Sequence, residues 1–147
     1  MRVTGRLASV VTGQREPGVY RWRSSAHHGA LARELAGAGW ALYTLDGRLV
    51  TDVAQLFDAC AAGLRFPTWF DRDWDALRHC LADLSWLPAK GHVLLWDRFG
   101  TLARTDPQAW QRVYEVCRQA VAARLREGAP PLYVLLRGVG PAEVPLL

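Results

Sequence analysis

The residues best suited to chemistry in this sequence are carboxylates that follow two aromatic side chains. Trp69 and Phe70 come directly before Asp71, Asp73 and Asp75. Acids in the first turn of a helix often do no more than offset the partial positive charge of its N-terminus. Protein interfaces, however, are enriched in large aromatic residues beside charges, whereas a solvated helix cap needs none. The segment therefore favours a docking surface for another protein, with Trp69 exposed.

An acid–base pair is the competing interpretation of these carboxylates. Such a pair needs a pocket, perturbed pKa values and a defined separation, whereas neighbouring aspartates on one helix turn usually face solvent. Asp75 and His79 are four residues apart on the expected helix, so a weak intrahelical contact is the plainest interpretation of that pair. We therefore expect no catalytic residues.

Motifs of the common catalytic, nucleotide-binding and metal-binding sites are absent from the sequence. It contains no His-Glu-x-x-His, Cys-x-x-Cys, Gly-x-Gly-x-x-Gly, Walker-type loop or Gly-x-Ser-x-Gly. Cys60, Cys80 and Cys117 fall on apolar helix faces, where buried thiols are far more common than metal ligands. We expect no metal, no cofactor and no enzymatic activity.

The charge of the chain is unevenly distributed. Its 147 residues suffice for one domain with a sizeable core, and the net charge is +4. Residues 51–83 carry six aspartates and three arginines, while the segments on both sides are basic. An acidic zone on a basic protein steers a cationic partner towards that zone. The basic segments leave an RNA-binding module open as an alternative.

Three short apolar runs alternate with helical patterns, which predicts an α/β fold. The runs are Trp40–Leu45, His92–Trp96 and Leu132–Leu136. Their near-continuous apolar character is typical of parallel strands buried on both faces. Helices are predicted to begin at Thr51 or Asp52, at Asp73 and at Asp106-Pro107, because Asp caps a helix and Pro suits its first position.

Residues 1–39 are expected to form an N-terminal elaboration within one compact unit with residues 40–147. Leu7–Val11 and Val19–Trp22 lie on either side of a Gly- and Pro-containing turn, which favours a hairpin. Ala30–Leu35 favours a short helix. The chain opens with no signal-peptide pattern and has no apolar run near the roughly 18 residues that a membrane span needs. We therefore expect a cytoplasmic protein.

Residues 41–138 resemble the barstar family of ribonuclease inhibitors. The resemblance rests on the order of the elements and on Trp74-Asp75-Ala76-Leu77 followed by Cys80-Leu81. The segments Asp83–Pro88 and Pro17–Trp22 resemble larger bacterial members of the family that carry an N-terminal extension. The resemblance implies a three-stranded parallel sheet with packed helices, inhibition without catalysis, and a nuclease partner.

The resemblance also implies which residues meet that partner. The aromatic loop and the acidic helix would enter the nuclease cleft, where carboxylates take the place of substrate phosphates. Two positions depart from the family: His79 stands at its most important inhibitory aspartate and Gln119 at a glutamate. Tight binding to the family's usual nuclease should therefore be lost. The expected partner-binding residues are Trp69, Phe70, Asp71, Arg72, Asp73, Asp75, Arg78, His79 and Gln119.

The function implied is that of a bacterial inhibitor or immunity protein, as in a toxin–antitoxin pair. It would bind a ribonuclease or a nuclease-like toxin as a monomer in a one-to-one complex, without binding nucleic acid or membrane. One alternative is a protein-interaction module that has lost nuclease binding and uses residues 1–39. The other is the RNA-binding module named above.

Overall fold

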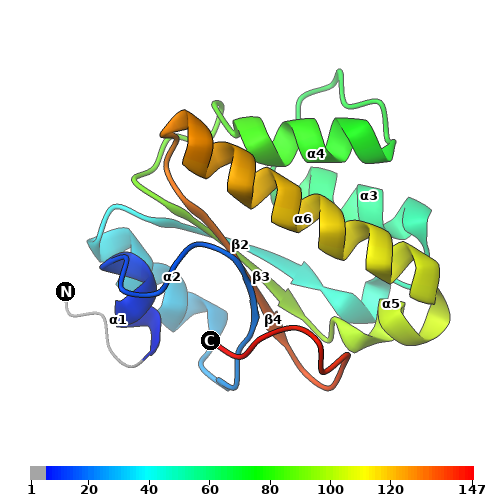
Figure 1. Cartoon of the computed structure of the whole chain (residues 1–147), viewed down its shortest axis with the longest axis horizontal. Helices are drawn as coiled ribbons and strands as arrows, with labels where there is room; N and C mark the ends of the chain where they lie inside the picture. Colours follow the sequence, from blue (N-terminus) through cyan, green and yellow to red (C-terminus); the bar gives the residue numbers. More distant parts are fainter. Residues whose placement is uncertain (1–5) are drawn as a thin grey trace.

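The structure is a four-stranded parallel sheet covered by helices on both faces (Figure 1). It is a computed structural model and describes residues 6–147. The strands are β1 (Val19–Arg21), β2 (Ala41–Asp46), β3 (His92–Asp97) and β4 (Leu132–Arg137), in the order β1-β4-β3-β2. This arrangement confirms the predicted α/β fold, because β2, β3 and β4 are the three expected strands and β1 is added by the N-terminal segment.

Six α-helices accompany the sheet within residues 6–147. They are α1 (Arg6–Val11), α2 (His28–Gly37), α3 (Val53–Gly63), α4 (Trp74–Asp83), α5 (Gly100–Thr105) and α6 (Pro107–Glu127). In Figure 1, α3, α4 and α6 lie above the sheet and α1 and α2 below it. Each face has its own apolar core: Leu94 and Trp96 of β3 point into the first, whereas Val93 and Leu95 point into the second. This alternation follows from the two-residue period of a strand.

The helix starts follow the local signals in the sequence. The carboxylates of Asp52, Asp73 and Asp106 each accept a hydrogen bond from the backbone N–H three residues later, at 2.8, 2.7 and 3.1 Å. Each such cap is typically worth about 0.5–2 kcal/mol. Gly128, with a φ of +68°, ends α6 in the left-handed conformation that glycine adopts without strain. The caps thus confirm the predicted starts of α3, α4 and α6.

The N-terminal hairpin expected from the sequence does not form. Leu7 and Val10 instead lie on the buried side of helix α1, and β1 runs parallel to β4 with Val19 opposite Val134. The spacing of Leu7, Val10 and Val11 also fits a helix, and β4 offers Val19 a strand partner from the far end of the chain. A hairpin prediction considers only neighbouring segments, so it misses this partner. Helix α2 covers the segment where a short helix was expected, and it buries Leu31 and Leu35.

The cysteines are free and buried, as predicted. Burial raises the pKa of Cys80 to about 11 and that of Cys117 to about 12, and it raises the pKa of Cys60 as well. Thiols with such pKa values are protonated and unreactive at neutral pH. No helix within residues 6–147 has the length and apolarity that crossing a membrane requires.

His92 is a buried histidine on the central strand, and it should make stability depend on pH. Its side chain is 1% exposed, and its Nδ1 lies 2.9 Å from the hydroxyl of Tyr43. Burial, helped by the positive charge of Arg124, lowers the pKa of His92 to about 4. Between pH 6.5 and 4 the unfolded state therefore binds more protons than the folded state. The free energy of unfolding thus decreases as the pH is lowered through this window.

His92 should lower the free energy of unfolding by on the order of 3 kcal/mol, since each unit of pKa shift corresponds to about 1.4 kcal/mol. This loss is complete only below pH 4. Urea unfolding from pH 7.5 to 4.5 measures the slope, and His92→Gln serves as the non-titrating comparison. The variant should lose most of the pH dependence over this range. If both proteins lost stability in parallel, the depressed pKa of His92 would not be its source.

Candidate partner-binding surface

The loop 65–73 joins α3 to α4 and presents the aromatic pair singled out in the sequence. Arg65 and Arg72, near its two ends, both adopt left-handed backbone conformations, with φ values of 51° and 56°. Between them, the N–H of Phe70 donates to the carbonyl of Pro67 at 3.1 Å, which closes a turn. The loop is therefore shaped by its own backbone as it brings residues 69–71 to the surface.

Trp69 is exposed, as predicted, and it is also supported from below. Its side chain stands edge-on against the rings of His79 and Trp86, at centroid distances of 6.3 and 6.4 Å. The residue is 52% exposed. Trp86 is itself anchored, because its indole N–H donates to the carbonyl of Leu64 at 2.9 Å. Binding hot spots at protein interfaces are enriched in tryptophan. Trp69 is accessible to a partner and is already held in place by its neighbours.

Phe70 plays a different part from its neighbour. Its ring packs edge-on against Phe57 and Phe66, at 6.0 and 4.9 Å between centroids, and it is half-buried against the core. The two adjacent aromatic residues therefore point to different surroundings. Replacing Phe70 should therefore lower the stability of the fold, whatever its effect on partner binding.

The three aspartates of the segment are not equivalent. Asp73 caps α4, so one of its oxygens is engaged by the N–H of Ala76. Asp75 lies in the first turn with its side chain 91% exposed and one oxygen 3.7 Å from Nη2 of Arg78. Asp71 is exposed and makes no hydrogen bond or ion pair with any residue from 6 to 147. Asp71 and Asp75 are thus the carboxylates most open to a partner.

Arg72 ties the loop to the neighbouring helix. Its guanidinium forms an ion pair with Asp58 of α3, and its Nη2 reaches the carbonyl of Ala54 at 3.5 Å. Both charged side chains remain substantially exposed, so the pair adds little stability by itself. Its geometric effect is to hold the left-handed Arg72 just before the cap of α4.

A shallow cleft of about 200 Å³ separates α4 from α6. Asp75 and Arg78 line it on one side, and Arg112, Glu115 and Gln119 on the other. The amide of Gln119 donates to Glu115 at 3.4 Å, and the guanidinium of Arg112 lies 5.9 Å from the ring of Trp74. The acidic stretch of the sequence thus lies beside Arg112 of a distant helix as well as its own Arg78, so the surface is of mixed charge.

The structure therefore brings together most of the residues predicted to bind a partner. Trp69 and His79 are in ring contact, and Asp75, Arg78 and Gln119 surround one cleft. Arg112 and Glu115 were missed, because nothing local predicts that α6 packs beside α4. Their spacing with Gln119, at i, i+3 and i+7, was the one available signal that they share a helix face.

No cluster of three or more His, Cys, Asp or Glu side chains suited to a metal occurs in the described part of the chain. What the surface offers is a supported tryptophan, open carboxylates and arginines on two helices. These groups bind by hydrogen bonds, charge and apolar contact.

Comparison with protein-family models identifies the family of this chain. The family model "Barstar (barnase inhibitor)" matches residues 40–137. The comparison with curated proteins found no match. A solved structure of Drosophila ORC bound to AT-rich DNA and Cdc6 contains a chain that is 13% identical, with a TM-score of 0.46; the match covers 95% of this chain and 44% of that one. Since the family model spans well over half of the 147 residues, this protein belongs to the barstar family of non-enzymatic barnase inhibitors.

Proposed function

We propose that the protein inhibits a ribonuclease, or a toxin with a nuclease-like cationic cleft, by inserting the loop 65–73 and the first turns of α4 into that cleft. The observation that carries the proposal is the position of Trp69, which is exposed, supported by His79 and followed in the chain by the open carboxylates of Asp71 and Asp75. The complex is one-to-one and forms in the cytoplasm.

Each group has a distinct task in such a complex. Asp71 and Asp75 accept hydrogen bonds from the Arg and Lys side chains that would otherwise hold the phosphates of RNA. Trp69 supplies apolar contact area and excludes water from these charge pairs, which strengthens them. Inhibition then follows from occupancy of the cleft alone, and it requires no chemical step on the inhibitor.

Two truncations test this assignment. Trp69→Ala and Asp75→Ala should each weaken binding to the target nuclease by about 2 kcal/mol, or roughly thirtyfold. Neither side chain is buried, so the free energy of unfolding should stay nearly unchanged. Inhibition titrations of RNA cleavage measure the first effect and urea unfolding the second, with the target taken as a nuclease encoded beside this protein.

Arg126→Ala is the matched control, because Arg126 is an exposed residue near the end of α6. Its inhibition constant should equal that of the unmodified protein. The assignment would be wrong if substitutions in α1, β1 or α2 weakened binding while Trp69→Ala and Asp75→Ala did not. That result would favour a protein-interaction module that works through the N-terminal segment.

A further inference from the structure

The path of the chain creates a crevice at the carboxyl end of β4. After β1 the chain passes through α2 on one face of the sheet, whereas after β3 it passes through α5 and α6 on the other face (Figure 1). Strand β4 lies between β1 and β3. In open parallel sheets, the carboxyl ends of the strands at such a reversal point are where ligands bind.

A cavity of about 280 Å³ lies at this place, and we name it the switch crevice. Arg21 ends β1, and Arg23 and Ser24 follow it; Arg137 ends β4, and Gly138 follows. All five residues line the cavity. The first three belong to the segment before residue 40, so the crevice exists only because β1 has joined the sheet. The family match begins at residue 40.

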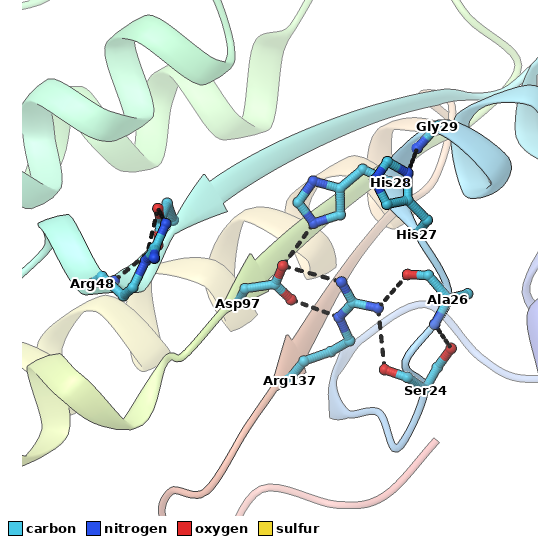
Figure 2. A network of polar contacts seen from close by, with 9 residues as sticks. Ser24, Ala26, His27, His28, Gly29, Arg48, Asp97 and Arg137 are labelled. Carbon is cyan, nitrogen blue, oxygen red and sulfur yellow. Dashed lines mark hydrogen bonds and ion pairs between the residues drawn. The ribbon is translucent and has the colours of Figure 1, made fainter.

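Arg137 links the two sides of the crevice through hydrogen bonds (Figure 2). Its Nε and Nη2 donate to the two oxygens of Asp97 at 2.5 and 3.0 Å, and its Nη1 donates to the carbonyls of Ser24 and Ala26 at 3.1 and 2.8 Å. His28 contacts the same carboxylate, with its Nε2 2.6 Å from Oδ2 of Asp97. The segment before α2 is thereby fastened over the strand ends.

The same hydrogen bonds compensate the negative charge of Asp97, the acid paired with Arg137. Burial by itself would raise the pKa of Asp97, but hydrogen bonds from Arg137 and His28 outweigh it, so the pKa lies below its ordinary value. Asp97 is thus ionised and already paired with a guanidinium. It does not compensate the charges of the other arginines at this edge.

Arg21 and Arg23 retain hydrogen-bond donors that no protein group uses among residues 6–147. Arg21 uses its Nε on the carbonyl of Val144 at 2.7 Å, and Arg23 is exposed, with no hydrogen bond or ion pair to residues 6–147. The hydroxyl of Ser24 accepts from the N–H of Ala26 and keeps its own hydrogen to donate. A second cavity of about 280 Å³ shares Gly138 and adds Arg98 and Arg104. The edge beside β4 therefore carries more arginines than the paired carboxylate of Asp97 compensates.

We infer that the switch crevice binds the phosphate group of a small ligand. Guanidinium groups match the oxygens of phosphate in paired hydrogen bonds, and two of them with a hydroxyl supply more donors than the two oxygens of a carboxylate require. The crevice is slightly smaller than the 300–1,000 Å³ typical of small-molecule sites, so it suits one phosphate and not a whole dinucleotide. The phosphate belongs either to a free nucleotide or to RNA.

The test uses the full chain and three probes at constant ionic strength: inorganic phosphate, 5′-AMP and a short single-stranded RNA. Amide NMR shifts of Arg23, Ser24 and Gly138 report on the site, and the titrations give dissociation constants. Arg23→Gln should raise the dissociation constant of phosphate roughly tenfold, as expected for one charge-assisted hydrogen bond. Arg126→Gln, which removes the same charge from α6, should leave it unchanged.

The probes also identify where the phosphate comes from. Tighter binding of 5′-AMP than of RNA would assign a free nucleotide, whereas tighter binding of RNA that is lost in Arg23→Gln would assign an RNA phosphate. The inference is overturned if none of the probes shifts the three amides, or if Arg23→Gln and Arg126→Gln weaken binding equally, because diffuse surface charge would then explain it. Equal thermal unfolding of both variants and the unmodified protein checks that the fold is intact.

Discussion

Replacing His79 with Asp and Gln119 with Glu together should strengthen inhibition of a barnase-type ribonuclease by several kcal/mol. These are the two positions where the family resemblance implies acids that this chain lacks. Close charge pairs in the barnase–barstar complex itself have measured coupling energies of about 1.5–7 kcal/mol. His79 and Gln119 are exposed, and they lie beside Trp69 and opposite Asp75 respectively. A cleft that receives Trp69 would therefore also meet the two new carboxylates.

The substitutions carry a small cost within the free protein. Asp at position 79 would stand four residues from Asp75, and Glu at position 119 four residues from Glu115. Such like-charge pairs on a helix cost about 0.2–0.5 kcal/mol each. The gain in binding should exceed this cost, and it should shrink as salt is raised, because screening weakens charge pairs at the rim of an interface.

Inhibition titrations at low and high salt measure the gain, with the single substitutions and Arg126→Asp for comparison. Arg126→Asp changes the net charge by as much as the two carboxylates together, but at the far end of α6. If the double variant gained nothing, α4 would not enter a nuclease cleft. Tight inhibition by the unmodified protein would show instead that Asp71 or Asp75 already supplies enough charge.

Replacing Arg124 with Met should destabilise the fold by about 2–4 kcal/mol, since each buried acceptor left without a partner costs about 1–3 kcal/mol. Arg124 is 1% exposed. Its Nη1 donates to the carbonyls of Ala82 and Asp83 at 3.0 and 2.8 Å, and its Nε to that of Pro130 at 2.9 Å. The carbonyls of Ala82 and Asp83 belong to the last turn of α4, where carbonyl groups have no hydrogen-bond partners within the helix.

Two effects oppose each other at Arg124. Burial disfavours the charged guanidinium and lowers the pKa of Arg124, so its removal recovers part of that desolvation cost. The loss of three hydrogen bonds should still dominate. Because Arg124 joins α4 to α6 and to the start of β4, its replacement should also loosen the helix that carries Asp75 and His79.

Urea unfolding of Arg124→Met and Arg126→Met separates this role from a general effect of charge. Arg126 lies two residues further along the same helix and is exposed, so its replacement should change stability by no more than about 0.5 kcal/mol. Equal stabilities of the two variants would mean that water satisfies the freed carbonyls. The last turn of α4 would then be held by its apolar contacts alone.

Local features of the sequence predicted most of the framework. The helix caps at Asp52, Asp73 and Asp106 depend on contacts between residues three positions apart. The buried strands β3 and β4 can be predicted from their apolar runs. Strand β2 has a similar run but is less buried, because it lies at the edge of the sheet. Exposure of Trp69 followed from its position in a loop outside any apolar helix face.

Other features depend on segments that are distant in sequence. The apparent hairpin is a helix and a strand because β1 pairs with β4, more than 100 residues away. Phe70 turns inwards because Phe57 of α3 lies beside it. Arg112 and Glu115 reach the acidic surface only because α6 packs against α4.

Local sequence patterns were thus sufficient to predict the α/β class, the helix starts, the family and the segment that carries the aromatic and acidic residues. Each of these depends on residue types within a few positions of one another. The packing of distant segments was needed to show that the acidic segment presents a surface of mixed charge. It was also needed to show that Arg21, Arg23 and Arg137 line one crevice at the end of β4. Helix packing and strand order set these neighbours, and both depend on the burial of apolar faces that are far apart in the chain.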